Sequence, residues 1–406
     1  MSTSIQETLK YFPPMGVYET LFRFMDACQK YMGEPGTHPW AQGFPLTSQL
    51  PDGPELPGSV SFTSADLKYP PATGIPRLLT AITRYYNHFY DAGITEDNVC
   101  VFAGGRPGIF ASVAFLPDDY DVLVEETEYT PYYDLMHLLE RRHHIIPSNE
   151  SNRFRPGLGE YRSAAAGVDP DRRQFFVKSN PCNPTGVVWG PESLDEFVHW
   201  IIENEHAALV DEAYEFFNES GPDSVLRYIE NIDDTNLFVS GAATKGLQVP
   251  GMRIGWIVSS RRNVEILRNW SSIGMGGVSR PAQLYVAGLL ETSRVTRARQ
   301  AVMNFFNGQR EFYREGLERL GVELYTGTGG FYHWGKLPGE GNSDQLNERL
   351  FRHKAAILPG RLCDMHRGEV DGSSNRFFRF SFGPLSPESR DSDLEILADC
   401  LQVPVK

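Results

Sequence analysis

The sequence has few cysteines, and their spacing forms neither a disulfide framework nor a metal site. The five cysteines (Cys28, Cys100, Cys182, Cys363 and Cys400) are scattered and include no CxxC pair. An odd, scattered set argues against a disulfide-stabilised secreted domain and against a structural zinc site. The pattern favours a reducing compartment, so we expect a cytoplasmic protein without a bound metal.

Long apolar runs are also missing. No stretch approaches the roughly 18 consecutive apolar residues that identify a membrane-spanning helix. The first residues, Met-Ser-Thr-Ser-Ile-Gln-Glu, lack the basic start and apolar run of a secretion signal. We therefore expect no membrane partner.

Positive charge is scarce. Lys and Arg number 38 against 52 Asp and Glu, which gives a net charge of −14. This sign argues against nucleic acid or an anionic membrane as the main partner, although it leaves room for one local basic pocket. The 406 residues are 41% hydrophobic, enough for a large core and two or three domains.

The sequence does contain short apolar runs that alternate with helical patterns. Predicted strands cover 98–102, 122–125, 175–177, 207–210, 237–239 and 254–259, and predicted helices between them include 75–90 and 191–203. This alternation predicts an α/β fold, a mostly parallel sheet flanked by helices.

The remainder of the chain predicts a smaller α+β domain, because short strands and helices follow one long charged helix over 293–320. We therefore predict an N-terminal segment joining the small domain (1–50), a large cofactor-binding domain (51–290) and a small C-terminal domain (291–406).

Five candidate functional positions come directly after predicted strands. They are the glycine turn at 103–108, Tyr129, Asn183, Asp211 and Lys245. In parallel sheets, ligands bind outside the carboxyl ends of the strands. We therefore expect these positions to share one site.

Each position taken alone is ambiguous. Lys245 lies among small residues, and burial there would favour a neutral amine able to form a Schiff base with an aldehyde; most lysines are nevertheless solvated surface charges. The glycine turn can bind an anion at a helix start, or be a simple turn. Asp211 can equally be a helix cap.

Four motifs together change this assessment. They are Asn-Pro-Cys-Asn-Pro-Thr-Gly at 180–186, Asp211-x-Ala-Tyr214, Thr-Lys245 with Gly-x-Arg253, and Arg379-x-Ser-Phe. In this order they resemble the fold type I pyridoxal-phosphate enzymes, and in particular the class I/II aminotransferases, the aspartate aminotransferase family. The resemblance runs from about residue 40 into the C-terminal domain.

This resemblance implies pyridoxal 5'-phosphate as cofactor and transfer of an amino group from an L-amino acid to a 2-oxo acid. Lys245 would form the Schiff base and carry the proton. Asp211 would keep the pyridine nitrogen protonated, so that the ring can withdraw electrons. Asn183 and Tyr214 would hydrogen-bond the phenolic oxygen, with Tyr214 also counted among the catalytic residues.

The resemblance also implies how the other cofactor and substrate groups are held. Tyr129 would stack on the ring, while the phosphate would be bound by Gly105, Arg106, Thr244 and Arg253.

For the substrate, Arg379 would bind the α-carboxylate as a bidentate pair. Gly43 would lie over that carboxylate, next to Asn183. Tyr69, and with it Ser279, would reach the phosphate of a neighbouring subunit, which predicts a homodimer with shared active sites.

The sequence departs from the family pattern in three respects. Ala242 stands where many relatives have a Ser or Thr that donates to the phosphate, which leaves Thr244 or Ser240 as substitutes. Pro107 removes one backbone donor from the glycine turn. No second arginine is evident for a substrate side-chain carboxylate, since Arg280, Arg361 and Arg376 have no positional support.

Two alternatives remain at this point. A β-lyase, a decarboxylase, or a cyclase or oxidase of specialised metabolism would share the same cofactor-binding residues. A sensor fused to a DNA-binding module would need a basic N-terminal segment, which the charge of −14 and the start of the resemblance argue against. The substrate is not identified. The aromatic residues Tyr129, Tyr132, Phe331, Tyr332 and Trp334 fit a substrate pocket less well than ordinary packing.

Overall fold

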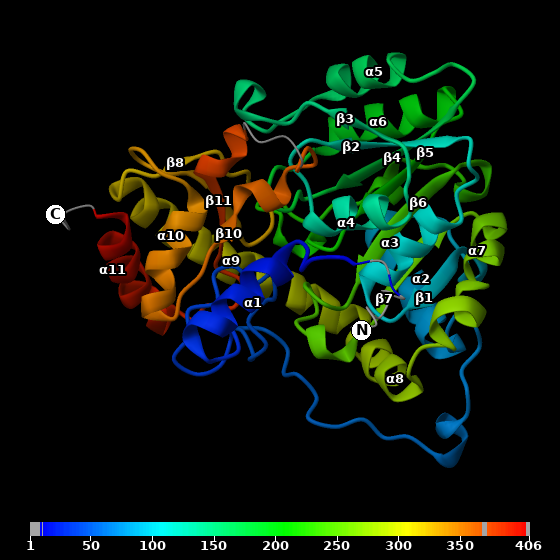
Figure 1. Ribbon diagram of the computed structural model, residues 1–406. Helices are drawn as coiled ribbons and strands as arrows, with labels where there is room; N and C mark the ends of the chain where they lie inside the picture. The colour runs from blue at the N-terminus through cyan, green and yellow to red at the C-terminus, as the bar shows by residue number, and fades with distance from the viewer. Residues whose placement is uncertain (1–8, 10, 368–371, 403–406) are drawn as a thin grey trace, which may run out of the picture.

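The computed structural model describes residues 9, 11–367 and 372–402. Two β-sheets form the frame of the molecule, each with its own helices (Figure 1). Within the described residues, no helix combines the length and apolar character needed to cross a membrane. All five cysteines are free thiols.

The larger sheet has seven strands in the order β1-β7-β6-β5-β4-β2-β3. Only β7 runs antiparallel to its neighbours. The central strands are buried throughout, as expected for a parallel sheet covered on both faces. The strand bounds are β1 (Val99–Phe102), β2 (Tyr120–Glu125), β3 (His143–Ile146), β4 (Arg173–Ser179), β5 (Ala207–Asp211), β6 (Leu237–Ala242) and β7 (Gly255–Ser259).

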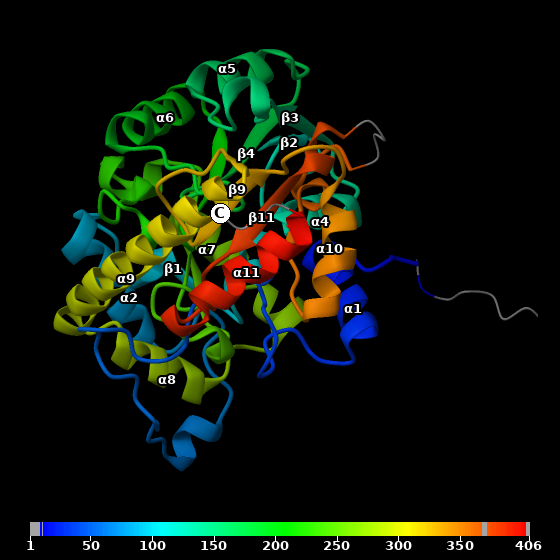
Figure 2. The same ribbon diagram turned by 90° about the vertical axis from the view of Figure 1, so that its left-hand side faces the viewer.

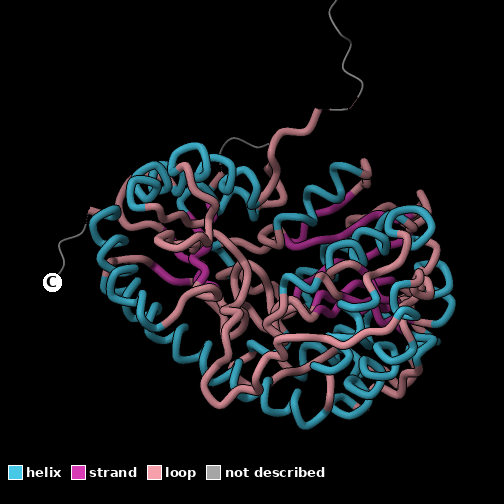
Figure 3. The backbone as a smooth tube through the Cα atoms, turned by 90° about the horizontal axis from the view of Figure 1, so that it is seen from below, coloured by secondary structure: helices cyan, strands magenta, loops and turns pink. Residues whose placement is uncertain are grey.

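Helices cover both faces of this sheet (Figures 2 and 3). Side chains along each strand alternate between two hydrophobic clusters, so that Phe175 and Phe176 point to opposite faces. One cluster includes α2 (Pro76–Tyr90), α5 (Leu158–Ala166), α6 (Pro191–Glu203) and α8 (Arg280–Leu289). The other includes α3 (Gly105–Ala114), α4 (Thr130–Leu138) and α7 (Arg261–Leu267). The predicted fold class is therefore confirmed.

Several elements in and around the large sheet have no counterpart in the sequence prediction, among them α4, α7, α8, β3 and α5. The edge strand β3 reads His-His-Ile-Ile and is partly exposed, so it lacks the apolar run that marks the central strands. Helix α5 has a weak apolar face, with only Tyr161 and Ala165 buried. The local sequence pattern is weak in both elements, so contacts with the rest of the fold determine their structure.

The smaller sheet is antiparallel, with the order β10-β11-β9-β8. Its strands are β8 (Glu323–Leu324), β9 (Tyr332–Lys336), β10 (Leu358–Pro359) and β11 (Phe377–Ser381). Its helices are the long α9 (Thr292–Arg319), α10 (Ser343–Leu350) and α11 (Arg390–Leu401), and the N-terminal α1 (Val17–Cys28) also contacts this part of the chain. The domain limits at 50 and 290 remain a prediction.

Two backbone connections join the parts and frame the site. After α1, the chain pairs with the small sheet, where Ser381 N–H donates to the carbonyl of Trp40 (2.8 Å) and Leu46 N–H to that of Gly383. The loop after β2 is fastened in the same way, since Glu128 N–H donates to the carbonyl of Cys363 (2.9 Å) and Met365 N–H to that of Glu126 (2.8 Å).

A buried carboxylate fixes the N-terminal segment. Asp393 of α11 is fully buried and accepts four hydrogen bonds. Its donors are His38 Nδ1 (2.6 Å), Trp40 Nε1 (3.2 Å), Tyr313 Oη (2.7 Å) and Ser389 Oγ (2.8 Å). Because buried donors without partners are costly, this residue holds the segment against α9 and α11.

We therefore expect Asp393→Ala to lower the free energy of unfolding by about 3 kcal/mol, because it leaves several buried donors unpaired. Urea unfolding of the variant measures the loss. Asp391→Ala is the matched control, because this aspartate lies exposed on the same helix; its effect should stay within about 0.5 kcal/mol. Equal effects of the two substitutions would contradict the role given to Asp393.

Candidate active site

A cavity of about 360 Å³ lies at the carboxyl edge of the large sheet. It is lined by loops that follow β1, β2, β4, β5 and β6, and by the N-terminal segment. Most predicted site residues line it: Gly43, Gly105, Arg106, Tyr129, Asn183, Asp211, Tyr214, Thr244, Lys245 and Arg253. The strand order brings together positions that are far apart in the sequence, as expected for a parallel sheet.

Lys245 lies in the loop after β6. Burial lowers the pKa of its ammonium from 10.5 to about 7. The positive charges of Arg106, Arg379 and Arg253 lower this pKa as well, whereas Asp211 opposes them. A large fraction of this lysine is therefore a neutral amine near pH 7, the form that can act as a nucleophile or a base.

Asp211 is the last residue of β5. Burial raises the pKa of its carboxyl from 3.8 to about 6, while hydrogen bonds from Ala213 N–H and Tyr132 and the charge of Lys245 oppose this rise. The Tyr132 hydroxyl lies 3.1 Å from Oδ2, and Ala213 N–H lies 3.1 Å from Oδ1. The carboxylate is thus still mostly ionised at neutral pH and held in a fixed orientation.

A polar chain runs from the loop after β4 to the small sheet. Arg379 of β11 donates from Nη1 to Asn183 Oδ1 (2.7 Å) and from Nη2 to the carbonyl of Ala41 (2.7 Å). Asn183 Nδ2 lies 3.5 Å from the Tyr214 hydroxyl, which also contacts the hydroxyl of Tyr332. Two sheets therefore contribute side chains to one network.

Arg379 itself is buried, and its Nε has no hydrogen-bond partner among the described residues. This Nε–H is therefore free to donate to a further acceptor. An anionic group with two oxygens matches the planar fork of arginine.

A second cationic region surrounds the start of α3. Gly104 has φ 101° and caps the helix, and a Cβ at this position would lie 2.4 Å from Arg253 Nη2. Glycine is therefore required for the arginine to approach the helix N-terminus, where free N–H groups attract anions. Pro107 stands in the first turn, where the missing N–H costs no intrahelical bond.

Tyr129 is the residue before α4 and faces the same cavity. Its hydroxyl accepts a hydrogen bond from Arg106 Nε at 2.7 Å, and the guanidinium carbon lies 5.7 Å from the ring centroid. The contact fixes the phenol ring against the start of α3. One face of the cavity is thereby aromatic and its rim is cationic.

Gly43 comes from the N-terminal segment. Its carbonyl oxygen contacts Lys245 Nζ, and a Cβ here would lie 2.4 Å from the Tyr332 hydroxyl. Only glycine fits this position without displacing the tyrosine. The segment therefore covers the lysine directly.

Tyr69 and Ser279 do not line this cavity. Tyr69 is 89% exposed, and it lies in a surface depression together with Ser279 at the start of α8. Nothing within the chain brings the phenol near Lys245, so its predicted role depends on a second subunit.

Several residues at the site were not identified from the sequence. Val17, Tyr18 and Leu21 of α1 and Tyr31 beyond it line the cavity, although the amphipathic pattern of this segment marks only a helix. The sequence favours a packing role for Tyr132, but its hydroxyl also donates a hydrogen bond to Asp211. The interpretation of Phe331 and Trp334 as packing agrees with their complete burial.

The chain is similar to known proteins over most of its length. Residues 41–394 match the model of the aminotransferase class I and II family. Aspartate aminotransferase of Thermotoga maritima is 24% identical over 322 residues, which cover 78% of this chain and 82% of the relative. The probable aspartate/prephenate aminotransferase of Thermus aquaticus is 26% identical over 312 residues, covering 75% and 78%.

Solved structures share the fold. Aspartate aminotransferase from Thermus thermophilus with maleate superposes with a TM-score of 0.79 at 20% identity, covering 96% of this chain and 97% of that chain. The aromatic aminotransferase from Pyrococcus horikoshii gives a TM-score of 0.76 at 18% identity, covering 93% and 98%. Since the family match spans most of the sequence, the chain belongs to the class I and II aminotransferases, enzymes that transfer amino groups with pyridoxal phosphate.

Proposed function

We propose that Lys245 is the residue that binds the cofactor and moves the proton during amino-group transfer between an L-amino acid and a 2-oxo acid. The observation that carries this proposal is a half-buried lysine with a pKa of about 7 that shares a cavity with a buried carboxylate, under the positive charges of three arginines. A neutral amine is the reactive form toward a carbonyl group.

The donor set of the cavity fits pyridoxal phosphate. Asp211 would hold the protonated pyridine nitrogen, and Asn183 and Tyr214 would donate to the phenolic oxygen. The glycine-bounded start of α3, with Thr244 and Arg253, supplies N–H, hydroxyl and guanidinium donors suited to a phosphate.

The phosphate contacts are completed by Gly105 and Arg106 at the first two positions of α3, and Tyr129 supplies the aromatic face against the ring. When bound, the cofactor supplies an aldehyde that condenses with amines and a ring that withdraws electrons from the substrate carbon.

Arg379 would bind the substrate's α-carboxylate. Its Nε–H has no partner, and Nη1 and Nη2 each use only one of their two N–H groups on Asn183 and Ala41, so donors for a bidentate carboxylate remain. Gly43 would lie over the same carboxylate. Lys245 would take the proton from the α-carbon as a neutral amine and return it at the cofactor's aldehyde carbon.

We further propose a homodimer in which Tyr69 and Ser279 complete the phosphate site of the partner. The nearly full exposure of a tyrosine ring beside α8 supports this arrangement, since it has no intramolecular role. The proposed large domain, residues 51–290, would hold the cofactor, and residues 1–50 and 291–406 would form the part that closes over it. Five free thiols support a cytoplasmic location.

The absorption spectrum tests the central assignment. Protein loaded with pyridoxal phosphate should carry a visible band that single L-amino acids bleach and a 2-oxo acid restores. Lys245→Ala should lose both the covalent linkage and turnover. Normal turnover in this variant would contradict the assignment, and release of ammonia or carbon dioxide without a 2-oxo acid would indicate other chemistry.

Heterodimers test the shared site. Tyr69→Ala and Lys245→Ala chains with different tags should each be weakly active or inactive alone. An isolated heterodimer contains one site with both changes and one intact site, so it should recover about half of wild-type activity. If each site were built from a single chain, no intact site would form and activity would be about half that of the Tyr69→Ala homodimer.

The lowered pKa of Lys245 makes the stability of the apoprotein depend on pH. Below pH 7 the folded protein contains a buried ammonium, which costs on the order of 5 kcal/mol for a pKa lowered from 10.5 to about 7. Between about pH 7 and pH 10.5 the unfolded chain binds more protons than the folded one, so the free energy of unfolding rises with pH.

We therefore expect apo Lys245→Met to be several kcal/mol more stable than wild type at pH 6, with the difference vanishing near pH 10.5. Urea unfolding at several pH values measures it. Lys68→Met, at an exposed position, is the control and should show no such trend. A constant difference at all pH values would show that packing, not ionisation, separates the two proteins.

A further inference from the structure

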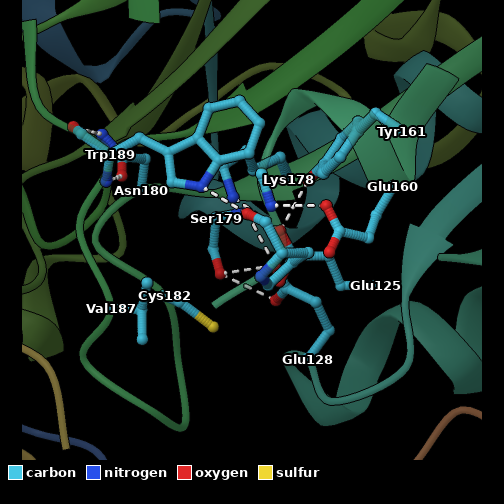
Figure 4. A network of polar contacts seen from close by, with 12 residues as sticks. Glu125, Glu128, Glu160, Tyr161, Lys178, Ser179, Asn180, Cys182, Val187 and Trp189 are labelled. Carbon is cyan, nitrogen blue, oxygen red and sulfur yellow. Dashed lines mark hydrogen bonds and ion pairs between the residues drawn. The ribbon is translucent and has the colours of Figure 1, made fainter. Parts of the chain in front are cut away.

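A cluster of buried charged groups, Glu125, Glu128 and Lys178, lies at the ends of β2 and β4 (Figure 4). These strands are parallel neighbours, so the residues at and just beyond their carboxyl ends meet. Glu125 and Lys178 form one pair: Nζ donates to Oε1 at 2.6 Å, and both side chains are 2% exposed. The Tyr161 hydroxyl also donates to Glu125 (2.6 Å), and Lys178 Nζ lies 4.1 Å from the Trp189 ring centroid.

Glu128, also fully buried, belongs to the same cluster but has a different set of partners. Among the described residues, no lysine or arginine forms an ion pair with it. Its Oε1 accepts from the backbone N–H of Ser179 (2.9 Å), its Oε2 from the backbone N–H of Tyr129 (2.8 Å), and the Ser179 hydroxyl lies 2.7 Å from Oε2. Backbone donors rather than a counter-charge hold this carboxylate.

Those partners face the cofactor cavity. Tyr129 and Ser179 both line it. The Ser179 hydroxyl in turn accepts from the backbone N–H of Asn183 (3.2 Å), whose amide contacts Tyr214 and Arg379. One buried carboxylate thus connects the residues proposed for the ring face and for the phenolic oxygen, which come from loops after two different strands.

We propose that Glu128 is a positioning residue for the cofactor. Its carboxylate fixes the backbone of Tyr129 directly and that of Asn183 through Ser179, and so sets the width of the cavity across the pyridine ring. This inference rests on the proposed roles of Tyr129 and Asn183. Burial and the neighbouring charge of Glu125 raise the pKa of Glu128 to about 8, whereas the hydrogen bonds from Ser179 and from Tyr129 N–H favour the ionised carboxylate and oppose this rise.

The geometry explains why a carboxylate is needed. Two backbone N–H groups approach from different sides, one at each oxygen, and a carboxylate accepts at both. An amide has one accepting oxygen and one donating nitrogen, so it satisfies either Ser179 or Tyr129 and repels the other. Glu128→Gln should therefore displace one wall of the cavity, although the two side chains have almost the same volume.

The test measures cofactor binding rather than turnover. Apoprotein is titrated with pyridoxal phosphate, and the dissociation constant is read from tryptophan fluorescence. We expect Glu128→Gln to raise this constant about tenfold, the size of effect typical for one lost charge-assisted hydrogen bond. The pH at which the visible band of the loaded protein changes should also shift, because Asn183 moves relative to the phenolic oxygen.

Glu125→Gln is the matched control within the same cluster. It removes a carboxylate that contacts Lys178 and Tyr161 but none of the cavity residues named above. The substitution leaves the buried Lys178 ammonium without its carboxylate partner, so the thermal midpoint of the apoprotein should fall. The dissociation constant of its folded fraction should stay within about twofold of wild type, well under the tenfold change of a lost charged hydrogen bond.

Ser179→Ala keeps the experiment decisive if Glu128→Gln does not fold. It retains the contact between Glu128 and Tyr129 but cuts the connection to Asn183, so the pH response of the visible band should shift. The inference is overturned if the folded variants bind cofactor with wild-type affinity and an unchanged pH response, even when their thermal midpoints fall. Wild-type protein that binds no pyridoxal phosphate would instead overturn the proposed function.

Discussion

The site depends on one constraint: the charged side chains of Lys245 and Asp211 are withdrawn from water at the carboxyl edge of the large sheet. Lys245 and Asp211 are both buried there, and burial shifts their pKa values toward each other, to about 7 and about 6. In water the same groups would be ionised and strongly solvated. At neutral pH much of Lys245 is therefore a neutral amine while Asp211 stays mostly ionised, and the arginine side chains around them attract anions.

The small sheet also contributes to this environment, through contacts to residues that line the cavity. Arg379 reaches across to Asn183, and Tyr332 reaches Tyr214. Gly43 brings the N-terminal segment over Lys245. Water is therefore excluded from three sides, by parts of the chain that belong to different layers. Burial of the lysine is a property of the assembled molecule and not of its own loop.

The sequence predicted the large sheet, because its central strands are continuous apolar runs. It also predicted many residues that line the cavity, because Asn183, Asp211 and Lys245 follow three of these strands. It did not predict β3, whose His-His-Ile-Ile lies at a half-exposed edge. It also missed Glu128 and the α1 side chains. A glutamate in the sequence carries no sign of being buried, and its importance arises only when β2 and β4 bring Ser179 beside it.

The N-terminal segment is hydrogen-bonded to residues that lie more than 300 positions later in the sequence. Trp40 donates to Asp393 across 353 positions, and His38 and Leu46 pair with the backbone at Lys354 and Gly383. The last strand of the large sheet, in contrast, ends at Ser259. During synthesis the sheet can therefore form while the segment that covers Lys245 is still unpaired, because its sites have not yet been translated. The segment that covers the reactive lysine can therefore dock fully only after α11 has emerged from the ribosome.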